Sequence, residues 1–296
     1  MIFVSAAAAP KRPNVLLLVA GGEIPGPGIL RFSRAYAACP SSAPGRAAIL
    51  GGRFPHAAPC GEPSLQSELK RAGYSAACMG EWGCGPAAGD RAAAIGFLRA
   101  GIPSSFCLCL ALDSDAAPVL EALDRTGLAG DTIVVLTSLR GPAAGGPRDE
   151  SARVPLALRY PRRIPGGRVL EFLVSGVDLA PTLLGLCGLE TPRAMQGRDL
   201  SDLLLNGQGD PPESIYAEGG LHTEGEWRMV VRGLDKLVVS AQLQPTHLFN
   251  LGQDPEELVN LVSEPFERRK RDEMLALLRR WMLRTGDRLP RRLGVR

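Results

Sequence analysis

The chain has 296 residues, of which 45% are hydrophobic and 22% are charged, and its formal net charge at pH 7 is +3. This composition is typical of a folded globular protein and excludes a disordered one. So small a net charge gives no indication of a nucleic-acid-binding surface. No segment reaches the roughly 20 continuous apolar residues that a membrane span requires.

The first residues, MIFVSAAAAPKRPN, resemble the end of a signal peptide, because small residues precede Pro10. They lack a charged n-region, however, and their apolar stretch is short. The localisation therefore stays open between export, for example to a periplasm, and the cytoplasm.

Cysteine and histidine usage favours no metal centre and no disulfide framework. The seven cysteines are odd in number and have no dense spacing. The three histidines, His56, His222 and His247, are too scattered to indicate a histidine-based zinc site. We expect each of them to be a surface or capping residue.

The first two thirds of the chain alternate between strands and helices. The continuous apolar run at residues 14–19 is typical of a buried parallel strand. We expect strands at residues 14–19, 74–79, 106–112 and 132–137, and helices at 64–72, 116–126, 178–187 and 199–205. Such alternation predicts a mostly parallel sheet covered on both faces, which is a three-layer α/β/α sandwich.

The pattern changes after residue 210. Short strands are expected at residues 227–232, 236–240 and 247–250. A closing helix begins near Pro265 and carries an apolar stripe at helical spacing, formed by Met274, Leu277, Leu278 and Trp281. We therefore expect a core domain at residues 11–210 and a small antiparallel C-terminal subdomain at residues 211–296.

The segment SAPGR at residues 42–46 carries the strongest chemical signal. Ser42 enters a predicted helix, a proline fixes the turn, and Arg46 follows four residues later. Positions i and i+4 share a helix face, so Arg46 can hold an anion beside Ser42. The first backbone N–H groups of the helix also attract negative charge. The alternative is a plain helix start, because Ser, Pro and Gly are ordinary start signals.

Seven segments stand in the order found in one known family. They are KRPNVLLLV, SAPGR with GGRFPHAAPCG, SLQSELKRAGYSAACMGEWG, DTIVVLTSLRG, DESARVPLALRYP, VSGVDLAPTLLGLCGLETPRAMQGRDLSDLL and HLFNLGQDPEELVNL. Together they extend from Lys11 to about Leu261, and their succession closely resembles the sulfatase family of the alkaline-phosphatase-like superfamily. The resemblance implies an arylsulfatase-like fold and sulfuric ester hydrolase activity.

In that family, the cysteine or serine of a Cys/Ser-x-Pro-x-Arg motif is oxidised to formylglycine, whose hydrate attacks the sulfur of a sulfate ester. By this resemblance Ser42 holds the formylglycine position and Arg46 is its partner. Cys39 is not equivalent, because no proline follows it two residues later. With an intact family site, the cofactor would be calcium or magnesium.

The positions at which the family binds its metal carry other residues in this chain. Two aspartates usually end the first strand, where Gly21 and Gly22 stand here. A later Asp-His/Asn pair is replaced by Leu139 and Arg140. A calcium-type site needs several oxygen ligands, mostly carboxylates. Because these four residues provide no carboxylate and one positive charge, we expect no bound metal.

Three further family positions are also changed. GEWG replaces Gly-Lys-Trp-His, so Glu81 stands in the place of a lysine. The histidine that usually follows the strand FCLCLAL is absent, and Asp113 and Asp115 lie in its neighbourhood. We expect Arg140 to occupy part of the former cation site and Glu81 to pair with Arg46 or Arg140.

The leading interpretation is a sulfatase-fold pseudoenzyme, impaired or inactive in hydrolysis and retained for binding an anionic group, a sugar or a protein. The alternative is an active sulfate or phosphate ester hydrolase with a rebuilt metal site. There Asp113 and Asp115 would bind a relocated metal, and Ser42, as serine or formylglycine, would act with Arg46. A third reading is a scaffold or a decaying gene product. The sequence does not specify an oligomeric state.

Overall fold

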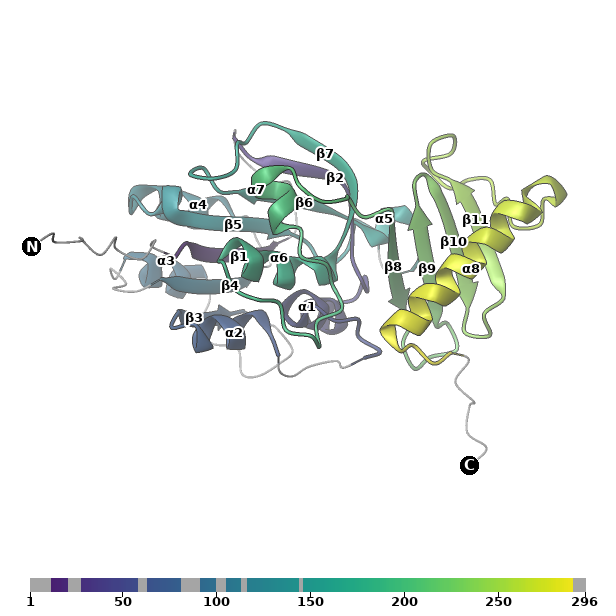
Figure 1. The fold of residues 1–296 in the computed structure, drawn as a ribbon, viewed down its shortest axis with the longest axis horizontal. Helices are drawn as coiled ribbons and strands as arrows, with labels where there is room; N and C mark the ends of the chain where they lie inside the picture. The colour runs from purple at the N-terminus through teal and green to yellow at the C-terminus, as the bar shows by residue number, and fades with distance from the viewer. Residues whose placement is uncertain are drawn as a thin grey trace, which may run out of the picture.

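The computed structural model describes residues 12–20, 28–57, 63–80, 91–99, 105–112, 116–143 and 146–289. Two sheets dominate it, a large one in the first two thirds of the chain and a small one near the C-terminus (Figure 1).

The large sheet has seven strands in the order β3-β4-β1-β5-β6-β2-β7. These strands are β1 Asn14–Ala20, β2 Leu30–Tyr36, β3 Ser75–Met79, β4 Phe106–Leu112, β5 Thr132–Thr137, β6 Arg153–Arg159 and β7 Val169–Ser175. Strands β3, β4, β1 and β5 run parallel, β2 runs parallel to β7, and β6 runs antiparallel to both of its neighbours. The sheet is therefore mostly parallel, as its apolar strand runs predict.

Helices cover both faces of the large sheet. One apolar core joins the sheet to α1 Ser42–Gly51, α2 Leu65–Arg71, α6 Leu179–Leu186 and α7 Ser201–Asn206. A second core joins the opposite face to α3 Arg91–Arg99 and α4 Ala117–Arg125. Strand residues alternate between the two cores, as Val134 and Val135 of β5 do. The expected three-layer sandwich is confirmed.

The small sheet is antiparallel, in the order β11-β10-β9-β8. Its strands are β8 Ser214–Gly219, β9 Trp227–Arg232, β10 Asp235–Ser240 and β11 Pro245–Asn250. Helix α8 Arg268–Thr285 lies across one face of this sheet and buries Met274, Leu278 and Trp281 there (Figure 1). The closing helix and the small antiparallel sheet are therefore confirmed. No helix in the described part of the chain has both the length and the apolar character that a membrane span needs.

Four strands were not expected from the sequence, namely β2, β6, β7 and β8. Strand β2 carries exposed Arg31 and shifts register against both of its neighbours, so its apolar residues do not alternate regularly. Strand β6 contains Pro155, which is unusual in the interior of a sheet. Strand β8 includes Glu218, which is fully buried. In β2, β6 and β8, tertiary contacts override the local pattern.

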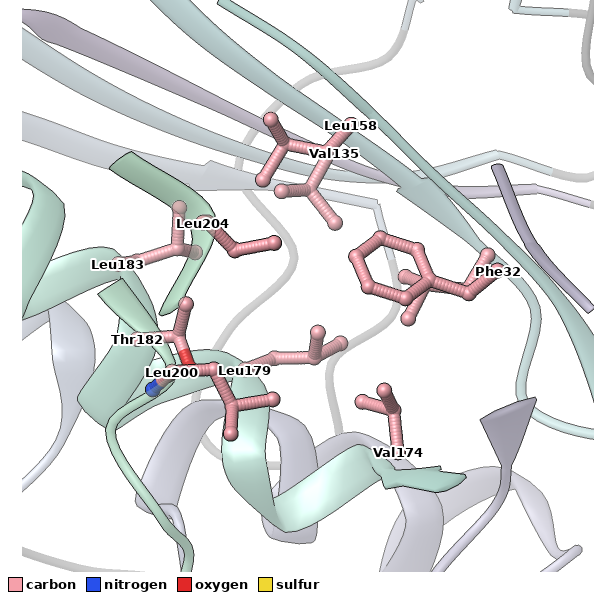
Figure 2. A pocket seen from close by; sticks show the side chains of 10 residues that line it. Phe32, Val135, Leu158, Val174, Leu179, Thr182, Leu183, Leu200 and Leu204 are labelled. Atoms are coloured by element: carbon pink, nitrogen blue, oxygen red, sulfur yellow. The ribbon is translucent and has the colours of Figure 1, made fainter. Parts of the chain in front are cut away.

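A cavity of about 20 Å³ lies between the large sheet and helices α6 and α7 (Figure 2). Its lining is apolar except for Thr182, and it comprises Phe32, Val135, Leu156, Leu158, Val174, Leu179, Thr182, Leu183, Leu200 and Leu204. An apolar cavity of this size has room for an added methyl group but few polar partners for a water molecule.

This cavity predicts opposite outcomes for two neighbouring substitutions in β5. Val135→Ile adds a methyl group on the cavity side and is expected to change the free energy of unfolding by less than about 1 kcal/mol. Val134→Ile adds it to the fully buried opposite face and is expected to destabilise by about 1–3 kcal/mol through overpacking. Urea unfolding measures both, and equal losses would contradict the expectation.

Candidate functional site

Helix α1 begins at Ser42 and places SAPGR in its first turns. No side chain caps this end, and the first turn carries no acidic residue. The first backbone hydrogen bond of the helix runs from the Gly45 N–H to the Ser41 carbonyl, at 2.8 Å. The amides that precede it, those of Ser42 and Ala43, are among the donors that a helix start leaves unpaired. This end of α1 therefore favours an anion.

Ser42 and Arg46 lie one helical turn apart and differ in exposure. Ser42 is exposed, whereas Arg46 is half-buried. The Nε atom of Arg46 is buried and has no hydrogen-bond partner among the described residues. A buried guanidinium nitrogen without a partner is costly, so an acceptor at this point would be stabilising. The pairing of Ser42 with Arg46 on one face of α1 follows directly from their spacing.

The turn after β5 packs directly against the first turns of α1. A Cβ atom built on Gly45 would lie 3.7 Å from both Leu139 Cδ2 and the Leu139 carbonyl oxygen. The same Cβ would lie only 2.8 Å from the Cys39 carbonyl oxygen, so glycine is required at this position. An apolar side chain, and not a carboxylate, thus stands beside the helix that carries Ser42.

Arg140 is exposed, and its Nη1 donates to the Ala143 carbonyl at 3.0 Å. The Ser138 hydroxyl donates to the Arg140 carbonyl at 2.6 Å, which closes the turn. The Gly141 N–H donates to the Ser151 carbonyl at 2.7 Å and fastens the turn to helix α5 Asp149–Ala152. Whether the Arg140 guanidinium fills a former cation site stays a prediction.

The remaining site positions follow the carboxyl ends of strands that share one sheet edge. Strands β1, β3, β4 and β5 are parallel, so their carboxyl ends meet at the edge where α/β proteins usually bind ligands. Glu81, Asp113, Asp115, Gly21 and Gly22 follow β3, β4 and β1 in sequence and lie outside the described residues. The expected pairing of Glu81 with an arginine therefore stays a prediction.

Cys39 is unsuited to act as a nucleophile in place of Ser42. Its side chain is 1% exposed, and burial together with the charge of Glu218 raises the pKa of its thiol to about 12. The reactive thiolate is therefore scarce near neutral pH.

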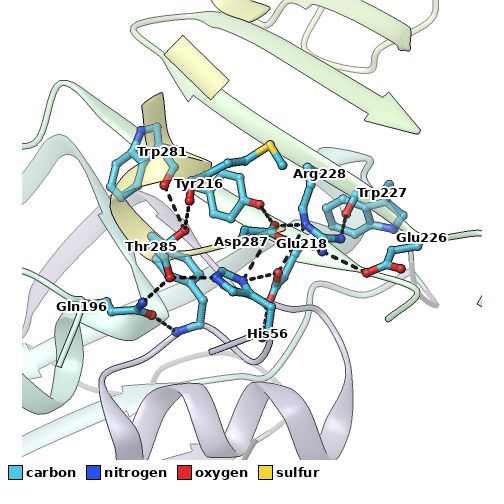
Figure 3. Close-up of polar contacts among 12 residues, drawn as sticks. His56, Gln196, Tyr216, Glu218, Glu226, Trp227, Arg228, Trp281, Thr285 and Asp287 are labelled. Atoms are coloured by element: carbon cyan, nitrogen blue, oxygen red, sulfur yellow. Dashed lines mark hydrogen bonds and ion pairs between the residues drawn. The ribbon is translucent and has the colours of Figure 1, made fainter. Parts of the chain in front are cut away.

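A buried ion cluster lies beyond the other end of α1 (Figure 3). His56 Nδ1 contacts Glu218 Oε2 at 2.7 Å, and the His56 backbone N–H donates to Glu218 Oε1 at 2.9 Å. The Arg228 guanidinium bonds Asp287 and lies 3.4 Å from Glu218 Oε2. It also donates to Glu226 at 2.9 Å. The expectation of a surface position for His56 is wrong, because its side chain is only 2% exposed. The alternative of a capping role agrees with its ring, whose Nε2 lies 3.2 Å from the carbonyl of Thr285 at the end of α8.

A second buried cluster joins the small sheet to helix α5. Lys236 Nζ lies 2.9 Å from Asp149 Oδ1 and is also paired with Glu257. Tyr36 of β2 donates to Asp149 Oδ2 at 2.9 Å, and the Asp149 backbone N–H donates to Glu257 at 2.7 Å. Sequence reasoning missed both clusters. A charged residue inside an apolar strand, such as Arg228 in WRMVVR, was the available signal. Such a residue indicates a buried ion pair, because a buried charge needs a partner.

A family model described as N-sulphoglucosamine sulphohydrolase, C-terminal, matches residues 148–283. An N-acetylglucosamine-6-O-sulfatase from Bacteroides thetaiotaomicron is 27% identical over 186 residues, which cover 57% of this chain and 33% of that protein. Arylsulfatase K from Xenopus laevis is 30% identical over 178 residues, which cover 54% of this chain and 33% of that protein. The chain thus spans about a third of the length of these curated relatives.

Solved structures share the fold at low sequence identity. A protein in complex with its substrate D-glucosamine-2-N,6-O-disulfate superposes with a TM-score of 0.83 at 17% identity, covering 96% of this chain and 100% of that chain. A 2-O GAG sulfatase gives a TM-score of 0.79 at 19% identity, covering 94% of this chain and 93% of that chain. The sheet and these neighbours define an alkaline-phosphatase-like fold. Within that fold class, the chain is similar in sequence to sulfatases over more than half of its length.

Two glycines of α1 provide a matched test of the packing beside Ser42. Gly45→Ala is expected to destabilise by about 1–3 kcal/mol, because its Cβ meets the Cys39 carbonyl at 2.8 Å. Gly51→Ala, whose Cβ has no neighbour closer than 3.9 Å, is expected to be neutral or to stabilise by up to about 1 kcal/mol. Thermal and urea unfolding compare them, and tolerance of Gly45→Ala would contradict the close approach.

The buried lysine provides a second stability test. Lys236→Met leaves two buried carboxylates without their cation and is expected to destabilise by about 3–5 kcal/mol. The control Lys70→Met, at an exposed position, is expected to change stability by less than about 0.5 kcal/mol. Similar urea midpoints for the two variants would show that the Lys236 cluster is not a stabilising contact.

Proposed function

We propose that this sulfatase-family chain binds an anionic group, such as the sulfate of a sulfated sugar, at the N-terminus of α1. We propose further that its hydrolysis of sulfate esters is impaired. The single observation that carries the proposal is the pair of features at this helix start. Arg46 Nε is buried without a described partner, and the apolar side chain of Leu139 packs close by, against Gly45.

The anion-binding half of the proposal rests on donors that this chain supplies by itself. The uncapped first turn provides backbone N–H groups, Ser42 provides an exposed hydroxyl, and Arg46 provides the guanidinium. A tetrahedral oxyanion accepts hydrogen bonds from all three types of donor. A sulfated sugar is the class of ligand we choose, because one structural neighbour is described in complex with a disulfated glucosamine.

The impaired-hydrolysis half rests on the chemistry of the metal-ligand positions. A divalent hard cation needs several oxygen ligands. Leu139 offers an apolar side chain, Arg140 offers a positive charge, and Gly21 and Gly22 have no side-chain oxygen. These residues do not fit a calcium or magnesium ion. Loss of a single transition-state donor already costs about 100- to 1,000-fold in rate, so loss of the metal is expected to cost more.

Without its metal, the site can bind an anion but has little to activate a nucleophile. Among the described residues, no hydrogen bond joins the Ser42 side chain to a histidine or carboxylate that would remove its hydroxyl proton. The active alternative places Asp113 and Asp115 at a relocated metal, and both residues lie outside the described part of the chain. The experiments below therefore decide between binding without turnover and a rebuilt hydrolase.

The activity test uses chromogenic sulfate and phosphate esters with calcium, magnesium or manganese. We expect no turnover above that of Ser42→Ala with any of these metals, because the original ligand positions hold no carboxylate. Metal-dependent turnover that Ser42→Ala abolishes would establish the rebuilt hydrolase instead. Mass spectrometry of the tryptic peptide that contains residue 42 distinguishes serine from formylglycine.

The binding test titrates inorganic sulfate and glucosamine-6-sulfate into the protein by calorimetry. Arg46→Ala is expected to weaken binding by about 10- to 100-fold, which corresponds to the loss of one charged hydrogen-bonding group. The matched control Arg279→Ala removes an exposed arginine of α8 and is expected to leave binding unchanged. Equal affinities for wild type and Arg46→Ala would rule out the α1 site.

A further inference from the structure

His56 stands where three separate segments of the chain meet (Figure 3). It lies in the loop that follows α1, its ring faces Glu218 of β8, and it reaches the last turn of α8 through the Thr285 carbonyl. Phe54 stacks parallel to the imidazole ring, and Tyr216 packs against it edge to face. The side chain is therefore enclosed, and any change in its charge affects all three segments.

With Glu218 ionised, both ring nitrogens of His56 face atoms that only accept a hydrogen bond. Nδ1 lies 2.7 Å from the Glu218 carboxylate, and Nε2 lies 3.2 Å from the Thr285 backbone carbonyl. Neutral imidazole has one N–H donor and one lone pair. In the neutral form, one of these contacts would set a lone pair against an oxygen lone pair. Only the imidazolium donates to both.

The charge balance of the cluster also requires a second positive charge. Among the described residues, three buried carboxylates, those of Glu218, Glu226 and Asp287, face a single guanidinium, that of Arg228. Uncompensated buried carboxylates are expensive, so the cluster favours another cation. A proton on His56 lowers the excess negative charge from two to one, at hydrogen-bonding distance from Glu218.

A divalent metal ion fits this cluster poorly, although His56, Glu218 and Asp287 have the right ligand types. Arg228 already bonds Asp287 and lies 3.4 Å from Glu218, so a metal would meet a buried positive charge. The 2.7 Å separation between His56 Nδ1 and Glu218 is a hydrogen-bonding distance, which leaves no room for an ion between the two atoms.

We propose that His56 is an imidazolium in the folded protein and that it acts as a proton-dependent clasp between the loop after α1, strand β8 and the end of α8. The clasp does not depend on the proposed anion binding at the opposite end of α1. Loss of the proton breaks one of its two ring hydrogen bonds and loosens the small sheet and α8 from the helix that carries Ser42.

The direction of the pH effect follows from the groups that face the ring. Burial alone lowers the pKa of His56, but the hydrogen bond and charge of Glu218, with the charge of Asp287, raise it above its ordinary value. In the described part of the chain, Tyr216 packs against the ring, and Arg228 pairs with both carboxylates, Glu218 and Asp287. Because the pKa of His56 is raised in the folded state, its protonation stabilises the fold fully below the unfolded-state pKa of about 6.5. This stabilisation is lost as the pH rises through the folded-state pKa.

The test follows His56 by nitrogen-detected NMR and measures unfolding against pH. Both ring nitrogens of wild-type His56 are expected to be protonated at pH 7, with a titration midpoint above about 6.5. Between about pH 6.5 and that midpoint, the unfolding equilibrium constant is expected to rise by up to about tenfold per pH unit in the wild type. His56→Gln, which cannot donate at both positions, is expected to lack this rise.

His247→Gln is the matched control, because burial lowers the pKa of His247. The contribution of His247 to the pH dependence of stability therefore falls at or below about pH 6.5. Above that pH, this variant is expected to show the same rise of the unfolding equilibrium constant with pH as the wild type. A single protonated ring nitrogen at pH 7, or an unchanged slope in His56→Gln, would overturn the clasp. A melting temperature that EDTA lowers in wild type but not in His56→Gln would show a metal site instead. If His56→Gln does not fold, the NMR result decides.

Discussion

The position of α1 depends on buried charge pairing at the junction of the two sheets. Arg228 and Lys236 each project from the small sheet into a set of carboxylates, and each is fully buried. The first cluster reaches the loop after α1 through His56, and the second reaches α5 through Asp149. Buried pairs of this kind stabilise little in themselves, but breaking one is costly. They therefore fix the relative arrangement of the elements they join.

The two ends of α1 have opposite electrostatic character. Beyond its C-terminal end, carboxylates exceed guanidinium groups, and a proton on His56 reduces the excess. At its N-terminal end, Arg46 Nε has no hydrogen-bond partner among the described residues, and no side chain caps the first amides. A rigidly anchored helix that presents positive potential at its free end is a suitable support for an anion site. The proposed anion binding at this helix start would therefore not depend on a metal ion.

The fold was largely predictable because its signals are local. The apolar runs of β1, β4 and β5 and the stripe of α8 each identify an element without knowledge of its neighbours. Strands such as β6, with Pro155 in its interior, carry no such pattern and depend on the strands beside them. The spacing of Ser42 and Arg46 was equally local, and their placement on α1 follows from it. The partnership of His56 with Glu218 was not predictable, because 162 residues separate the two along the chain.

The central claim is that the helix start at Ser42 binds an anion without a divalent ion. The most direct measurement is diffraction from crystals soaked in calcium and sulfate together. We expect tetrahedral density within hydrogen-bonding distance of the Arg46 guanidinium and the first amides of α1, with no cation coordinated near Ser42. Strong calcium density bound to carboxylates beside the Ser42 hydroxyl would contradict it.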